Sequence, residues 1–126
     1  MIPTRWKTLF DDQLTDAVRR VDEARGHLTS GHGERAMQGA YQAVVTAGSI
    51  RVWMVDHPWE TALPADDMQR RVTAEFPSQF AAIVSLDPQA VLTGSWAPDA
   101  AGSYVDEADA YVRETRERFD AWVAEA

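Results

Sequence analysis

Residues 30–53, SGHGERAMQGAYQAVVTAGSIRVW, predict a long helix that begins after a glycine-containing turn. Small and apolar residues recur along two faces of this helix. A helix with two apolar faces is buried on two sides. Gly39 and Gly48 would each cost an exposed helix about 1 kcal/mol, and close packing against neighbours accounts for them better. We therefore expect the central helix of a bundle to run from about Gly33 to Val55.

Two further long helices are expected on either side of it in the sequence. Apolar residues at helical spacing predict a first helix from about Thr8 to Leu28, with Thr8 and Asp11 as a capping box. A last helix is expected to begin near Ser103, where Asp106 stands three residues later as the capping partner. Its aromatic and aliphatic residues also follow a helical spacing.

Prolines divide the region between the second and the last helix. A third helix is expected from Pro64 or Ala65, and Pro77 breaks or kinks it before a short segment over 77–86. The pair Asp87-Pro88 predicts a short turn through Leu92, and residues 94–102 are expected to form a connection. The fold class is therefore all-α. We expect one domain over residues 1–126, an antiparallel bundle of four main helices plus short helices.

The bulk composition excludes several classes of protein. The 126-residue chain carries 12 Lys and Arg against 20 Asp and Glu, a net charge of −8 that opposes general nucleic-acid binding. Cysteine is absent, so disulfides and thiolate chemistry are excluded. The first residues lack the apolar core of a signal peptide, and no apolar run is long enough to span a membrane. We expect an acidic cytoplasmic protein that does not bind membranes.

The order of elements resembles that of HEPN domains, a family of small helical domains. The resemblance rests on a helix that ends in a glycine turn, on a second helix beginning with Glu-Arg-Ala, and on the closing helix. The segments that carry it are ARGHLTSG over 24–31, ERA over 34–36 with AYQA over 40–43, and DEA over 106–108 followed by Phe119 and Trp122. It implies a helical bundle that acts as a homodimer.

HEPN ribonucleases use an Arg and a His a few residues apart near the last long helix, and a dimer completes their site. This chain departs from that pattern, because residues 93–102 contain neither Arg nor His. Arg51 and His57 have a compatible separation but stand at the end of the second helix. They are the candidate catalytic pair, with the cation stabilising phosphate charge and the imidazole moving a proton. The alternative is a surface Arg and a His at a helix C-terminus.

For the other candidate residues, a structural role explains the sequence better than a metal, catalytic or ligand site does. His32 and His57 should lie about 30 Å apart in an antiparallel bundle, so we expect no metal site from the three histidines. The pairs Asp66-Asp67 and Asp106-Glu107 stand at expected helix starts, where capping explains them. The five tryptophans are expected in the core or a subunit interface, although they could line an apolar ligand pocket.

Three functions remain open. The first is a non-catalytic HEPN-like binding or regulatory module, expected to be a homodimer with a possible protein partner and no cofactor. The second is a metal-independent HEPN-type endoribonuclease of toxin type that uses Arg51 and His57. The third is a binder of small apolar ligands, which requires an enclosed cavity of several hundred Å³.

Overall fold

The computed structural model describes residues 1–87 and 89–125, and these residues form helices without any strand. The expected all-α fold class is therefore confirmed. The helices, in chain order, are α1 (Thr4–Thr29), α2 (Gly33–Trp53), α3 (Ala65–Ala74), α4 (Ser78–Leu86), α5 (Ala90–Thr93) and α6 (Pro98–Glu125). The expected turn begins at Asp87-Pro88, and Pro88 lies outside the described residues.

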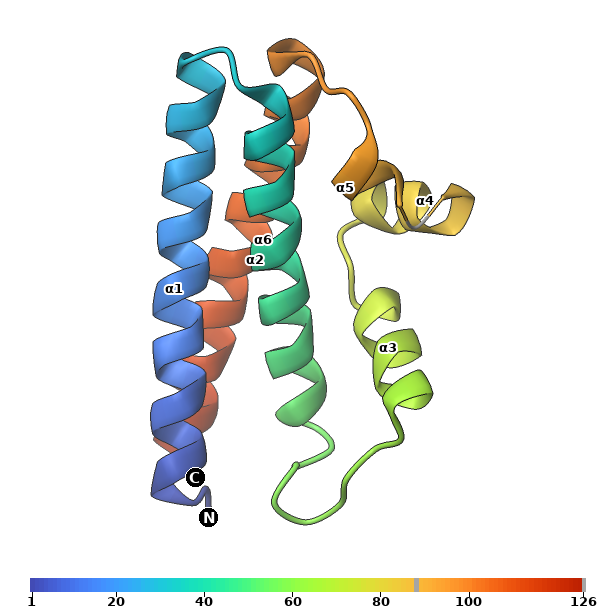
Figure 1. Cartoon of the computed structure of the whole chain (residues 1–126). Helices are drawn as coiled ribbons and strands as arrows, with labels where there is room; N and C mark the ends of the chain where they lie inside the picture. The colour runs from blue at the N-terminus through green and yellow to red at the C-terminus, as the bar shows by residue number, and fades with distance from the viewer. Residues whose placement is uncertain (88, 126) are drawn as a thin grey trace.

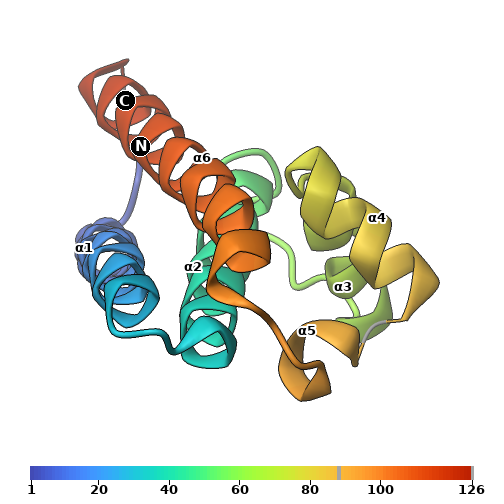
Figure 2. The ribbon, with the colours of Figure 1, turned by 90° about the horizontal axis from the view of Figure 1, so that it is seen from above.

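Three long helices form the body of the molecule. In the view of Figure 1, α1 runs upward, α2 runs downward, and α3 to α5 lead upward again. Helix α6 then runs downward to a C-terminus that lies beside the N-terminus. The segment that contains α3, α4 and α5 is not one long helix, because Pro77 interrupts it between α3 and α4. Viewed from above, α3, α4 and α5 lie to one side of the three long helices (Figure 2). Helices α2 and α6 therefore run in the same direction and pack directly on each other.

Helix α1 begins earlier than expected. It starts at Thr4, so Thr8 lies inside the helix and does not open a capping box with Asp11. Pro3 stands at the N-cap in an extended conformation, and its carbonyl accepts hydrogen bonds from the backbone N–H groups of Trp6 and Lys7. The added turn brings Trp6 against neighbouring aromatic rings. Tertiary packing therefore outweighs the weak local capping signal.

Helix α6 also begins earlier than expected, at Pro98 and not at Ser103. Proline suits the first helical position because its φ angle is already helical and its missing N–H needs no partner there. Ser103 lies within the helix, where its hydroxyl donates a hydrogen bond to the side chain of Gln79 and not to a cap. The expected connection over 94–102 therefore ends at Ala97, because burial of Ala101 outweighs the local glycine and proline signals.

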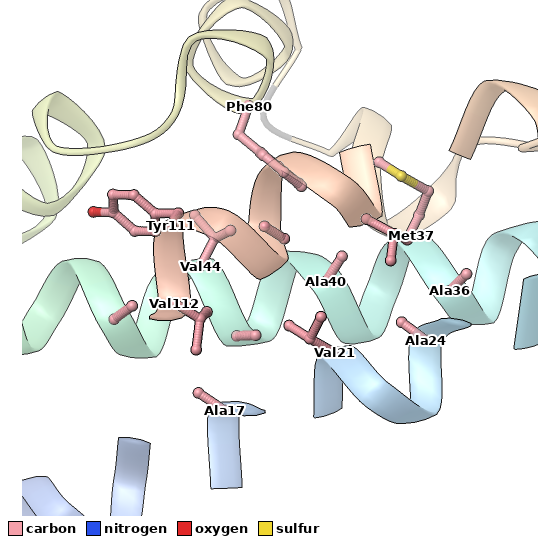
Figure 3. Packing of buried hydrophobic residues seen from close by; sticks show 14 of the residues in the cluster. Ala17, Val21, Ala24, Ala36, Met37, Ala40, Val44, Phe80, Tyr111 and Val112 are labelled. Carbon is pink, nitrogen blue, oxygen red and sulfur yellow. The ribbon is translucent and has the colours of Figure 1, made fainter. Parts of the chain in front are cut away.

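Helix α2 lies at the centre of the core. It contacts α1 and α6 along its length and also meets α3 and α5. Its last helical residue is Trp53, so Val55, where the helix was expected to end, lies beyond it and is 72% exposed. Figure 3 shows the small side chains that allow this packing. The buried cluster around them includes Ala17, Val21, Ala24, Ala36, Met37, Ala40, Val44, Phe80, Tyr111 and Val112.

Glycine is required where two backbones or side chains approach α2 closely. A Cβ atom on Gly33 would lie 2.0 Å from the carbonyl oxygen of Trp96, which is a severe overlap. A Cβ atom on Gly48 would lie 3.2 Å from Val72 Cγ1 and 3.3 Å from the Tyr111 hydroxyl. Gly39 has more room, at 3.5 Å from the Arg20 carbonyl oxygen. Gly33 and Gly48 thus set how closely the loop before α6, helix α3 and helix α6 approach α2.

Replacing Gly48 by leucine is expected to lower the free energy of unfolding by about 1–3 kcal/mol, because the larger side chain overpacks the contact with Val72 and Tyr111. Urea denaturation followed by circular dichroism measures the change. Gly26→Ala is the matched control, since its new Cβ meets nothing within 4 Å in the interior of α1. That variant should keep or gain stability. An unchanged stability of the Gly48→Leu protein would contradict close packing at this position.

Candidate functional site

Arg51 lies in the last turn of α2 and its side chain is buried against α6. Only 8% of the residue is exposed. Its Nε donates a hydrogen bond of 2.7 Å to Thr115 Oγ1, and its Nη2 donates one of 3.2 Å to the carbonyl oxygen of Tyr111. The guanidinium also lies 4.0 Å from the centre of the Tyr111 ring. Arg51 is therefore held by polar and cation–π contacts inside the molecule.

The groups around Arg51 compensate its buried charge. Thr115 accepts the bond from Arg51 while its own hydroxyl donates to the carbonyl oxygen of Tyr111 at 2.7 Å. A carboxylate oxygen of Glu114 lies 3.8 Å from Arg51 Nη2, at the outer edge of this cluster. Burial lowers the pKa of Arg51, and the positive charge of Arg118 acts in the same direction, whereas the negative charge of Glu114 acts in the opposite direction. A buried guanidinium with these partners stabilises the α2–α6 contact.

Tyr111 contributes its ring and its carbonyl to this site but not its hydroxyl. Within the described part of the chain, the buried Tyr111 hydroxyl has no hydrogen-bond partner. Burial raises the pKa of Tyr111 to about 12, although the nearby positive charge of Arg51 acts in the opposite direction. The phenol therefore stays neutral at physiological pH and cannot act there as a general base.

His57 lies in the loop after α2, among aromatic rings. Its ring stacks on Trp59 at a centroid distance of 4.6 Å and an interplanar angle of 13°, and it lies 5.9 Å from the Trp122 ring. Its Nδ1 is 3.4 Å from a carboxylate oxygen of Glu60. The side chain is 29% exposed. Stacking holds the imidazole against the end of the bundle and leaves it partly exposed.

The structure does not bring the two candidate catalytic residues, Arg51 and His57, into contact. Among the described residues, no hydrogen bond, ion pair or ring contact links Arg51 to His57. Their partners on α6, Thr115 and Trp122, are seven residues apart, which corresponds to about 10 Å along a helix. The donors of Arg51 point toward α6, so this conformation does not offer a phosphate the cation and the imidazole together.

The other candidate residues have structural partners. His27 and His32 lie at the opposite end of the bundle, with ring centroids 6.3 Å apart. Across residues 1–87 and 89–125, the structure brings together no group of three or more His, Asp or Glu side chains that could hold a metal ion. Asp66 and Asp67 stand in the first turn of α3 as expected, but the N-cap is Pro64 and no side chain caps the helix. Asp106 and Glu107, expected at a helix start, lie inside α6, because that helix already begins at Pro98. Asp106 pairs with Arg25 of α1, and Glu107 accepts hydrogen bonds from the backbone and side chain of Gln79, which ties α4 to α6.

The tryptophans lie at the edge of the core. Most of them surround Phe10 at the end of the bundle that holds both termini. We call this group the aromatic cluster: Trp6, Phe10, Trp53, Trp59, Phe119 and Trp122. Trp96 instead packs edge-on against Tyr104 at 5.3 Å. All five tryptophans are partly buried and pack against the core without lying inside it, so their expected place in the core is met only in part. A place in a subunit interface stays a prediction.

An open groove follows the seam between α1 and α2. Three adjoining hollows of about 450, 520 and 330 Å³ form it, each open to solvent. We call it the α1–α2 groove; it is lined by Asp12, Gln13, Asp16, Arg20, Glu23 and His27 of α1, by Arg35, Gln38, Gly39, Tyr41, Gln42, Val45, Thr46, Ser49 and Trp53 of α2, and by Leu92. These hollows are not the enclosed apolar cavity that a small-ligand binder requires.

Sequence reasoning identified Arg51 but missed the partners that bury it. Thr115 stands within the apolar stripe of α6, and a hydroxyl at such a position was the available signal for a buried polar contact. The α1–α2 groove was also missed, because its α1 residues are those of an ordinary solvated face.

The described helices include none that is long and apolar enough to cross a membrane. Comparison with protein-family models, with curated proteins and with solved structures finds no match to this chain. The contacts of its own residues therefore carry the functional argument.

Proposed function

We propose that this chain is a non-catalytic helical module, similar to HEPN domains, that acts by binding proteins, a second copy of itself among them. The observation that carries the proposal is the internal use of Arg51. Its guanidinium is bound by Thr115 and Tyr111 inside the α2–α6 contact. A residue engaged in this way supports a structural role and not the role of a phosphate-binding cation.

The position of His57 supports the same proposal. The imidazole stacks on Trp59, near Trp122, and has no contact with Arg51 among the described residues. General acid–base catalysis by this pair needs both groups within reach of one phosphate. An endoribonuclease using them requires Arg51 to leave Thr115, which would leave a buried hydroxyl without that partner and expose the α2–α6 contact.

The charge of the molecule also favours protein partners over RNA. The net charge of −8 repels a phosphate backbone at long range. The open form of the hollows favours a surface that docks another protein over a pocket that encloses an apolar ligand. The proposal includes a cytoplasmic location, which fractionation of cells that express the chain tests directly.

Purified protein is expected to leave single-stranded and structured RNA intact in the absence of added metal, because Arg51 and His57 do not form a shared site. The measurement is gel electrophoresis of labelled RNA over several hours at micromolar protein. The matched control is His57→Ala, which should give the same uncut RNA. Cleavage that disappears with His57→Ala and with Arg51→Lys would establish the ribonuclease function and overturn the proposal.

A further inference from the structure

The turn between α1 and α2 has the hydrogen bonds of a Schellman motif. The backbone N–H of His32 donates to the carbonyl oxygen of His27 at 2.7 Å, and that of Gly31 donates to the carbonyl oxygen of Leu28 at 3.1 Å. Gly31 has a φ angle of 78°, the left-handed conformation that the motif requires at this position. The turn therefore fixes the backbone positions of His27 and His32 relative to each other.

A Schellman motif also brings the side chains of these two positions together. Their contact is commonly hydrophobic, whereas in this chain both positions hold an imidazole. The ring centroids of His27 and His32 are 6.3 Å apart, with an angle of 51° between the ring planes. Within the described residues, neither imidazole forms a hydrogen bond or an ion pair. The nitrogens of both rings are therefore available to a ligand.

The electrostatic surroundings of the pair favour a cation on balance. His27 lies in the last turn of α1, where the negative end of the helix dipole attracts positive charge. The net charge of −8 attracts cations to the molecule at long range. Arg35 lines the hollow beside His27 and opposes a cation there, and Glu23 lines the same hollow with the opposite charge.

We propose that His27 and His32 form a binding site for a divalent transition-metal ion of the zinc, nickel or copper class. Imidazole nitrogen is a preferred ligand of these ions. Two nitrogens bound to one tetrahedral zinc ion lie about 3.3 Å apart, and the exposed side chain of His32 can turn to reach that separation. Within the described residues no third His, Asp or Glu joins the pair, so water completes the coordination. His57, at the opposite end of the bundle, takes no part.

A bound ion would join the last turn of α1 to the N-cap of α2, because His27 and His32 stand at these two places. The folded chain holds the two imidazoles together and the unfolded chain does not, so the ion stabilises the folded state. Zinc is therefore expected to raise the melting temperature of the wild-type protein. The site requires neither catalysis nor a protein partner, and it stands or falls independently of the proposed function.

Isothermal titration calorimetry of the untagged chain with Zn²⁺ tests the site. An excess of Mg²⁺ in the buffer occupies carboxylate groups on the acidic surface, since Mg²⁺ prefers oxygen ligands. We expect one Zn²⁺ per chain with a dissociation constant below about 0.1 mM. His27→Gln and His32→Gln should each raise that constant at least about tenfold, because even the loss of an outer-shell partner costs about 10–100-fold in affinity.

His57→Gln is the matched control, since His57 stacks on Trp59 away from the turn and should not affect the affinity for Zn²⁺. Nuclear magnetic resonance of the wild type needs no variant: Zn²⁺ should shift the ring signals of His27 and His32 and leave those of His57 unchanged. Circular dichroism checks that each variant is folded. A wild type that binds no Zn²⁺ in this range, or binding that both His27→Gln and His32→Gln retain, would overturn the inference.

Discussion

Replacing Phe10 by alanine is expected to lower the free energy of unfolding by about 3–5 kcal/mol. Phe10 is fully buried at the centre of the aromatic cluster and has five aromatic rings with centroids within 6.4 Å. Truncation removes the ring that α1, α2, α6 and the loop after α2 share, and the large surrounding rings cannot collapse fully into the cavity. Urea denaturation followed by tryptophan fluorescence measures the loss directly, because tryptophans line the site.

The neighbouring residue provides the control. Leu9 is also apolar but 40% exposed, so Leu9→Ala should change the free energy of unfolding by less than about 1 kcal/mol. A Phe10→Ala protein as stable as the Leu9→Ala protein would mean that the aromatic cluster is not a packed unit. Fluorescence of the native Phe10→Ala protein should shift to longer wavelength as water reaches the tryptophans.

Replacing Thr115 by valine is expected to lower the free energy of unfolding by about 1.5–3 kcal/mol. Valine keeps the shape of the side chain but removes the oxygen that accepts the hydrogen bond from Arg51 Nε. The buried guanidinium then has an unpaired donor, which costs more than the bond itself contributes. Thermal and urea unfolding followed by circular dichroism measure this effect.

Tyr111→Phe is the matched comparison for the same site. It removes a hydroxyl that has no hydrogen-bond partner among the described residues and keeps the ring and carbonyl that Arg51 contacts. We expect this variant to be as stable as the wild type or more stable. Equal losses for Thr115→Val and Tyr111→Phe would contradict a hydrogen-bond network centred on Arg51.

Periodicity predicts the helices of this chain well, and tertiary contacts decide where they begin and end. The start of α2 at Gly33 and of α3 at Ala65 follow from local turn and proline signals. The start of α6 does not, because Gly102 and Pro98 are typical of a connection until Ala101 finds a buried position. Capping signals extend over one turn and carry no information about a partner helix.

The candidate site was less accessible to sequence reasoning. An arginine in the last turn of a helix is typical of a solvated residue that interacts with the helix dipole. Arg51 differs only because α6 places Thr115 beside it, and the two residues are 64 positions apart. Burial of this kind depends on how two distant helices align. His57 was similarly ambiguous, since Trp122, one of the two rings beside it, comes from the last turns of α6.

The parallel packing of α2 and α6 has a consequence for the order of folding. Helices α1 and α2 are joined by a short turn and can pair quickly, whereas α6 joins them only after the whole segment from Met54 to Ala97 has closed into a loop. The contact of Arg51 with Thr115 belongs to that later event. If it forms after the rate-limiting step, its loss leaves the folding rate nearly unchanged and accelerates unfolding. The contact of the buried arginine with Thr115 then determines how slowly the native protein unfolds.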